Sequence, residues 1–91
     1  MNIQQLKQFQ SEYTLELQRN SKAPSTIRKY SRDIKRFLEF SKSCKTITQE
    51  TVKQYAAFLK TKYCAVTCNS YLISIHAFFR YAGLSELVIP L

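Results

Sequence analysis

The chain has 91 residues but only one glycine and two prolines. Such a low content argues against a turn-rich β fold, because these two residues supply the backbone conformations of tight turns. Tryptophan is absent, yet hydrophobic residues make up 45% of the chain and include six phenylalanines and six tyrosines. A domain of this size buries only about 60–65% of the surface of its unfolded chain and needs a dense core. The composition therefore favours a single all-α domain with short turns between helices.

Metal ligands and catalytic groups are also scarce. His76 is the only histidine, and the three cysteines, Cys44, Cys64 and Cys68, cannot all pair. Cys64 and Cys68 lack both the close spacing and the second ligand pair of a zinc site, so free thiols in a reducing cytosol are expected. The acids lack the setting of a catalytic pair, and there is no glycine loop for a phosphate. We expect no metal, no cofactor and no catalytic activity in these residues.

Signals for export or membrane insertion are missing as well. The sequence shows no signal peptide, no lipidation motif and no apolar run of about 18 residues. A basic amphipathic helix can lie on anionic lipid, but here the apolar face is aromatic and β-branched, which is typical of a packed core. We therefore expect a cytoplasmic protein that does not contact a membrane.

Negative charge is in short supply. Lysine and arginine number 14 against six acids, which gives a net charge of +8. Eight of the 14 cations lie between Lys22 and Lys45, where only Asp33 and Glu39 oppose them. An excess of this kind indicates a polyanionic partner such as nucleic acid.

The spacing of apolar residues predicts four helices. Pro24 precedes Ser25 and Thr26, either of which can cap the second helix, and Thr48 can cap the third. Gly83 supplies a left-handed terminator for the fourth. The predicted helices cover about 3–19, about 25–42, a third segment from Thr48 onward, and about 67–82.

The second helix has two contrasting faces. Its predicted core positions lie within an arc of about 100° and comprise Ile27, Tyr30, Ile34, Phe37, Leu38 and Ser41. The opposite arc carries Arg28, Arg32, Lys35 and Arg36, with Lys29 at its edge and Glu39 inside it. A basic helix face is most often simply solvated. The charge of the whole chain favours nucleic acid instead.

The fourth helix divides in a similar way. Its predicted core side comprises Cys68, Tyr71, Leu72, Ile75, Phe78, Phe79 and Ala82. The opposite stripe carries Asn69, Ile73, His76 and Arg80. The polar members can donate to phosphate oxygens or base edges, and Ile73 can touch a thymine methyl group. Any surface helix has a polar stripe opposite its core, so the fourth helix alone leaves both interpretations open. Together, the two helices predict a two-helix DNA surface.

Residues 21–84 resemble the N-terminal core-binding, or SAM-like, domain of tyrosine recombinases and phage integrases. The resemblance rests on the order of several core and capping positions rather than on any one of them. They are Ser25-Thr26, Tyr30 with Asp33, Thr48 leading to Tyr55 and Leu59, and Leu72-x2-Ile75-x2-Phe78-Phe79 before Tyr81-Ala82-Gly83-Leu84.

The resemblance implies a compact four-helix bundle over residues 1–84, with orthogonally packed helices, that clamps one face of duplex DNA at the core recombination site. In this family, the second and fourth helices meet the DNA. Relatives often carry arginine where this chain has His76, so a weaker and pH-dependent contact is expected there. The second-helix contacts implied are Lys22, Thr26, Arg28, Lys29 and Arg32, to which the cationic face adds Lys35. The fourth-helix contacts implied are Thr67, Asn69, Ser70, Ile73, His76 and Arg80.

The resemblance also implies that the nucleophilic tyrosine lies in a separate C-terminal catalytic domain, with residues 85–91 as the start of a linker to it. The chain is then a monomeric fragment that binds without catalysing. Its partners are double-stranded DNA, the catalytic domain and other recombinase protomers on the DNA.

Two alternatives belong to other classes. A stand-alone helix-turn-helix regulator needs a turn of about three to four residues, which the longer joints here fit poorly. A helical protein-interaction bundle would instead use its basic faces to bind acidic proteins.

Overall fold

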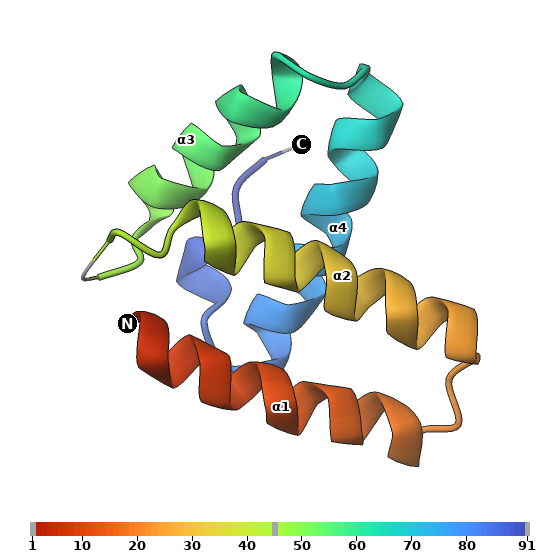
Figure 1. Cartoon of the computed structure of the whole chain (residues 1–91). Coiled ribbons are helices and arrows are strands. Elements are labelled where there is room, and N and C mark those ends of the chain that lie inside the picture. Colours follow the sequence, from red (N-terminus) through yellow and green to blue (C-terminus); the bar gives the residue numbers. More distant parts are fainter. Residues whose placement is uncertain (1, 45, 91) are drawn as a thin grey trace.

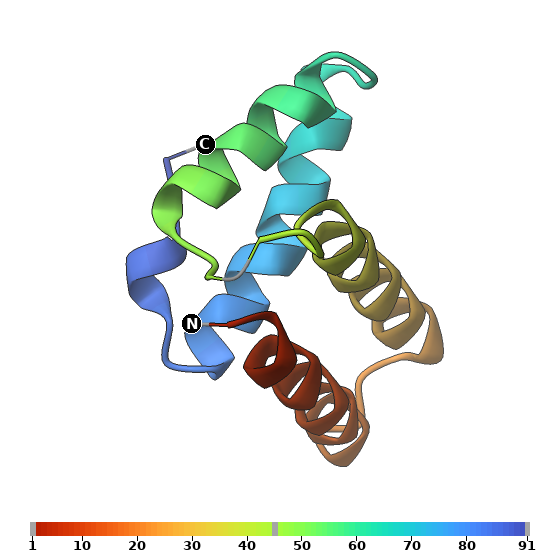
Figure 2. The same ribbon diagram turned by 60° about the vertical axis from the view of Figure 1, so that its left-hand side comes forward.

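The computed structural model describes residues 2–44 and 46–90, and this part of the chain forms four α-helices and one short 3-10 helix (Figure 1). Helices α1 and α2 run side by side, and α4 crosses behind α2 (Figures 1 and 2). Helix α3 and the 3-10 helix η1 pack against α4. The predicted all-α fold is confirmed. The bounds are α1 Ile3–Arg19, α2 Pro24–Phe40, α3 Gln49–Lys60, α4 Ala65–Tyr81 and η1 Ser85–Leu87. None of the described helices is long and apolar enough to cross a membrane.

Helix α3 begins where the sequence predicts. The Thr48 side chain accepts a hydrogen bond from the backbone N–H of Thr51, and the Thr51 hydroxyl accepts one from the backbone N–H of Thr48. Two of the N–H groups that a helix start leaves without partners are satisfied in this way. The end of α4 is also as predicted, since Gly83 has a φ of +76° and the Leu84 N–H donates to the Phe79 carbonyl at 2.7 Å.

The start of α2 differs from the prediction. The N-cap is Ala23, which makes no side-chain capping bond, and Pro24 is the first helical residue. Ser25 and Thr26 lie inside the first turn and are not caps. Proline suits this position because its fixed φ is helical and its missing N–H would have no partner there. The helix therefore starts through backbone geometry and not through a side-chain cap.

Two other helix boundaries also differ from the prediction. Helix α2 ends at Phe40, before the predicted limit, and the Ser41 hydroxyl donates to the Phe37 carbonyl at 2.9 Å. Helix α4 begins at Ala65, two residues earlier than predicted, with Cys64 as its N-cap. The N-terminal turn of α4 consequently belongs to the rigid helix and adds surface that the sequence analysis assigned to a loop.

Aromatic side chains connect all four helices. Phe37 of α2 meets Tyr55 of α3 and Phe79 of α4 edge-on, with ring centroids 5.2 and 5.7 Å apart. Tyr13 of α1 lies 5.6 Å from Phe78 of α4. Such tilted and edge-on pairs add to the stabilisation that apolar burial provides. Of the predicted α2 core, Ile34, Phe37, Leu38 and Ser41 are buried, and Ile27 and Tyr30 are partly buried.

Residues 84–90 fold back onto α3 and α4. Leu87 and Ile89 are buried in the core, and the Gln49 side chain donates to the Val88 carbonyl at 3.3 Å. The resemblance to recombinase domains predicts that residues 85–91 begin a linker. Their described part packs as one unit with the helices.

Two leucines of α1 provide a matched test of this packing. Leu6 is completely buried, whereas Leu15 is 52% exposed. We predict that Leu6→Ala lowers the free energy of unfolding by about 2–5 kcal/mol, because it leaves a cavity. Leu15→Ala should cost less than about 1 kcal/mol. Urea unfolding followed by circular dichroism measures both, and equal losses would contradict the described orientation of α1.

Candidate nucleic-acid interface

A buried carboxylate joins the two helices of the predicted interface. Asp33 of α2 is completely buried, and its Oδ2 accepts hydrogen bonds from Lys29 Nζ and Ser74 Oγ, both at 2.8 Å. Lys29 Nζ also donates to Ser74 Oγ at 3.0 Å and to the Ser70 carbonyl at 3.3 Å. Lys29 and Asp33 stand one turn apart on α2, and Ser70 and Ser74 stand one turn apart on α4. This Lys29–Asp33–Ser74 cluster therefore fixes where α4 crosses α2.

The second oxygen of Asp33 faces another cation. Asp33 Oδ1 lies 3.5 Å from Arg32 Nε and, within the described part of the chain, accepts no hydrogen bond. The Arg32 side chain remains 57% exposed. The carboxylate thus influences two cations differently: it holds Lys29 tightly and leaves most of Arg32 on the surface.

An open groove of about 530 Å³ lies beside this cluster, between α2 and α4. We term it the α2–α4 groove. Its walls bring together residues that are about 40 positions apart in the sequence. They are Thr26, Lys29 and Tyr30 from α2, and Val66, Asn69, Ser70, Ile73 and Ser74 from α4. Five of the predicted contact residues therefore share one groove: Thr26, Lys29, Asn69, Ser70 and Ile73.

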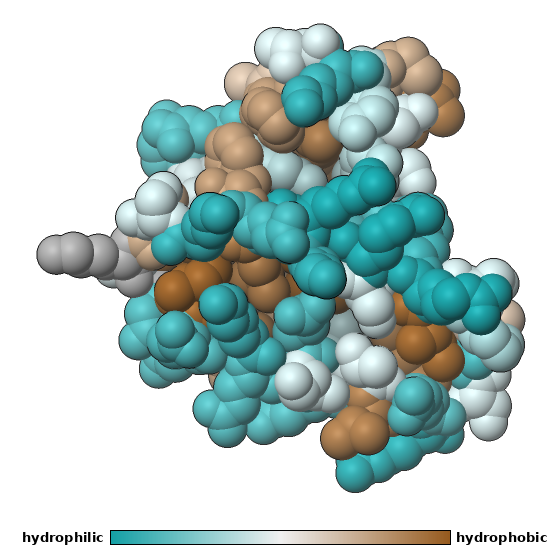
Figure 3. Space-filling model, viewed as in Figure 1, coloured by the Kyte–Doolittle hydropathy of each residue, from teal (hydrophilic) through white to brown (hydrophobic). Residues whose placement is uncertain are grey.

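Cations lie along the outer side of α2. Lys22, Arg28 and Arg32 are all exposed, and Figure 3 shows hydrophilic side chains running along α2 across the middle of this face. Lys35 is separate from them, because it lines a different groove, between α1 and α2, together with Lys7. We term the exposed set of Lys22, Arg28 and Arg32 the cationic ridge.

Two further predicted α4 contacts, Thr67 and Arg80, do not line the α2–α4 groove. Thr67 is half-buried, and its hydroxyl lies 3.4 Å from Cys64 Sγ. Arg80 is exposed in the last turn of α4 but does not line the α2–α4 groove. These two residues lie on α4 outside the lining of the groove.

The prediction that His76 stands on an exposed stripe is wrong. His76 is only 3% exposed, and its Nε2 accepts a hydrogen bond from the backbone N–H of Ile89 at 3.4 Å. Burial lowers the pKa of the imidazole below its ordinary value, and the charge of Arg80 lowers this pKa further. The cause is the C-terminal segment, which folds over this side of α4. His76 has a structural role in this chain.

Lys29 also differs from its predicted role as a free cation at the edge of the basic face. Its ammonium group makes three hydrogen bonds within the protein, one of them to the Asp33 carboxylate. Because the Asp33 carboxylate neutralises its ammonium group, Lys29 forms part of the groove wall but adds little to the positive charge of the groove.

Comparison with known proteins supplies the family. The family model described as the phage integrase N-terminal SAM-like domain matches residues 6–85. The chain belongs to this family. The resemblance found in the sequence is thereby confirmed, and every predicted contact residue lies inside the matched range. Comparison with curated proteins and with solved structures gives no match.

The structure of this integrase domain adds a groove residue that the sequence analysis missed. Val66 is 79% exposed and lines the same groove as Ile73, which stands two turns later on α4 and is 50% exposed. The sequence pattern did not indicate Val66 because the predicted helix began at Thr67, which is the residue after Val66. Two large apolar side chains exposed on one wall of the α2–α4 groove are suited to contact with an apolar group of a ligand.

The role of Lys29 in the integrase domain can be tested against Lys35, which lies on the same helix. We predict that Lys29→Gln lowers the free energy of unfolding by about 2–3 kcal/mol, because it leaves the buried Asp33 carboxylate without its closest cation. Lys35→Gln removes the same charge from the surface and should change stability by less than about 0.5 kcal/mol. Urea unfolding of the two variants at neutral pH makes the comparison, and a Lys29 variant as stable as the Lys35 variant would contradict the cluster.

His76 should give the integrase domain a measurable pH dependence. Its pKa is lower in the folded than in the unfolded state, so the unfolded state binds the proton more readily. The free energy of unfolding should therefore fall as the pH drops below about 6.5, the ordinary histidine pKa. His76→Gln should lose this dependence.

Urea unfolding between about pH 5.5 and 7.5 isolates the histidine, because other side chains with ordinary pKa values change charge little in this range. Identical pH profiles for the wild type and the variant would show that His76 is not held neutral in the fold.

Proposed function

We propose that this domain binds duplex DNA through the α2–α4 groove and the cationic ridge, and that it clamps one face of a recombination site for a tyrosine recombinase. One observation supports this most strongly: Thr26, Asn69 and Ser70 line a single groove, and the exposed Arg32 approaches the buried Asp33 carboxylate beside it at 3.5 Å. Hydrogen-bond donors and exposed cations on one face suit a phosphate backbone and its base edges. The net charge of +8 agrees with this partner.

In this proposal, the N-terminal half of α4 enters the major groove. An α-helix with its side chains is about 10–12 Å wide, and the major groove of B-DNA is about 12 Å wide. Asn69 carries an amide that can pair with a base edge, while Val66 and Ile73 can contact thymine methyl groups. These side chains would supply whatever sequence preference the domain has.

The cations of α2 would supply most of the affinity. Arg28 and Arg32 stand one turn apart, so both can reach phosphates along one strand, and Lys22 extends this line beyond the helix start. Thr26 can donate its hydroxyl to the same backbone. Arg80 and Thr67 are proposed as flanking contacts, and Lys35 as a long-range electrostatic contribution only.

We propose that catalysis belongs to a separate C-terminal domain of the recombinase and that the two domains hold opposite faces of the duplex. Two of the six tyrosines, Tyr13 and Tyr55, support that division. Burial raises the pKa of Tyr55 to about 12 and raises that of Tyr13 as well, which disfavours a phenolate nucleophile at either position. Both rings are instead packed into the aromatic core. Other recombinase protomers on the same DNA are the remaining proposed partners.

A charge-matched pair of variants tests the DNA surface. We predict that Arg28→Gln/Arg32→Gln weakens binding to a mixed-sequence duplex of about two helical turns. It should also flatten the plot of log K against log salt concentration by about 2, because each lost phosphate contact removes about 0.9 from the slope. Lys7→Gln/Lys53→Gln removes the same charge from α1 and α3 and should leave the slope nearly unchanged. Fluorescence anisotropy between about 50 and 200 mM salt measures both.

Thermal unfolding of each variant controls for loss of structure. If the Arg28/Arg32 variant is folded and its plot of log K against log salt concentration has the same slope as that of the Lys7/Lys53 variant, α2 does not contact the DNA. Absence of duplex binding by the wild type throughout this salt range would refute the proposed function itself.

A further inference from the structure

A second groove lies on the other side of α4. It has a volume of about 400 Å³ and is formed by the C-terminal half of α2, the end of α3 with the residues that follow it, and Tyr71 of α4. We term it the basic aromatic groove. Among its lining residues, three cations stand against one acid. The lining comprises Arg36, Glu39, Phe40, Lys42, Tyr55, Phe58, Leu59, Lys62, Tyr63 and Tyr71.

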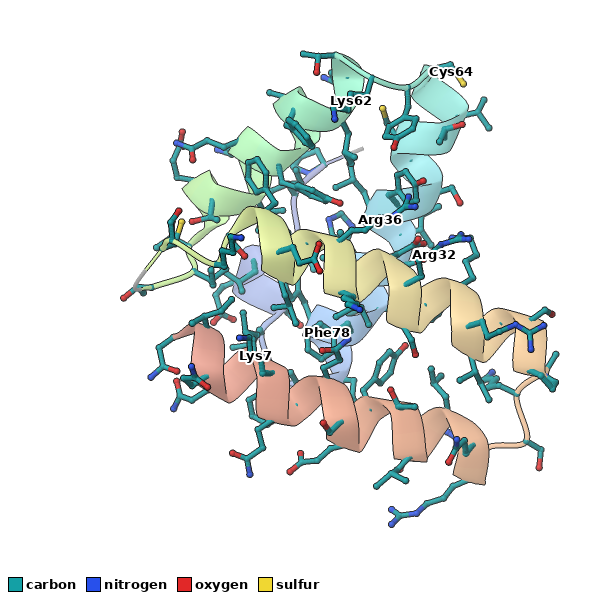
Figure 4. The ribbon with its side chains drawn as sticks, viewed as in Figure 1. Lys7, Arg32, Arg36, Lys62, Cys64 and Phe78 are labelled. Carbon is teal, nitrogen blue, oxygen red and sulfur yellow. The ribbon has the colours of Figure 1, made fainter. Side chains whose placement is uncertain are left out.

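Aromatic rings hold two of these cations without neutralising them. Arg36 donates to the Tyr71 hydroxyl at 2.5 Å, and its guanidinium lies 5.5 Å from the centre of that ring. Lys62 Nζ stands 4.9 Å from the centre of the Phe58 ring. Figure 4 shows Arg36 on α2 and Lys62 beyond the end of α3. A ring positions a cation but leaves its full charge for a ligand, unlike the Asp33 carboxylate beside Lys29.

Hydroxyl groups add donors to the same groove. The Tyr71 phenol accepts a hydrogen bond from Arg36 and still carries its own O–H donor. Tyr63, which is 39% exposed, packs edge-on against Tyr71 with ring centroids 5.3 Å apart. A guanidinium, an ammonium group and phenol hydroxyls together form a donor set that suits phosphate oxygens.

The two grooves follow one another along α2, with α4 between them. Lys29 lines the α2–α4 groove, and Arg36, two turns further along α2, lines the basic aromatic groove. On α4, the neighbouring residues Ser70 and Tyr71 line the first and the second groove, respectively. The first turns of α4 therefore form the wall that separates the grooves.

This arrangement matches the geometry of a duplex. The wall is one helix, about 10–12 Å wide, and the two backbones that border the major groove are separated by about 12 Å. If α4 lies in the major groove with Val66, Asn69 and Ile73 at the bases, one backbone runs along the cationic ridge of α2 and the other reaches the basic aromatic groove.

We propose that the basic aromatic groove binds the second phosphate backbone of the duplex, with Arg36 and Lys62 as its principal contacts. This inference rests on the proposed function, because it takes the insertion of α4 into the major groove as its starting point. Binding by the domain then involves both strands, with the cationic ridge on one and the basic aromatic groove on the other.

The test is the salt dependence of duplex binding by Arg36→Gln/Lys62→Gln. The variant should flatten the plot of log K against log salt by about 2 relative to the wild type, as expected for two lost phosphate contacts. Lys7→Gln/Lys53→Gln is again the charge-matched control. Arg36→Lys/Lys62→Arg keeps both charges and should retain the wild-type slope, which separates charge from packing. Thermal unfolding confirms that each variant is folded.

The outcomes separate this inference from the function on which it rests. A wild type that binds no duplex defeats the proposed function. If the Arg28/Arg32 variant flattens the slope but the Arg36/Lys62 variant matches its control, only the second backbone site is overturned. Binding of a polyglutamate peptide that the Arg36/Lys62 variant alone loses, with its duplex slope unchanged, would assign the groove to an acidic protein and also overturn the proposal.

Discussion

The burial of one carboxylate constrains the whole candidate interface. A buried charge is tolerated only when it is paired and hydrogen-bonded, and Asp33 meets this requirement through Lys29 on its own helix and Ser74 on α4. Apolar packing alone is not directional and would permit α4 to shift along α2. The Lys29–Asp33–Ser74 cluster selects one crossing point. Both grooves depend on that crossing, because α4 provides a wall for each of them.

The cations of this domain divide into two kinds, and their number alone does not measure their capacity to bind a ligand. Lys29 is paired with a carboxylate and serves the fold. Arg36 and Lys62 are held by aromatic rings and keep their charge, while Arg28 is simply exposed. Lys29 is structural because its ammonium group makes three hydrogen bonds to the cluster and to α4. Arg36 and Lys62, which are held by rings, remain available to a ligand.

Local sequence signals predicted the helices well, because each helix buries a regular apolar stripe and the Thr48 cap and the Gly83 terminator depend on nearby residues. These local signals did not predict the contacts between segments that are far apart in the sequence. Burial of His76 depends on Ile89, thirteen residues away, which folds back over α4, and nothing in the α4 pattern indicates such a cover. The role of Lys29 did have a signal, since Asp33 follows it by one helical turn and can pair with it. The two grooves depend on the helix crossing, and no periodicity in a single helix encodes a crossing.

The most direct test of this account is a chemical-shift titration of the isotopically labelled domain with a mixed-sequence duplex of about 20 base pairs at moderate salt. We predict that the perturbed amides cluster along α2 as far as Arg36, in the first turns of α4 and around Lys62, on both sides of the crossing that Asp33 fixes. The outer faces of α1 and α3 should remain unperturbed. Perturbations confined to α1 and α3, or none at all, would contradict the claim that the crossing of α2 and α4 forms the DNA-binding surface.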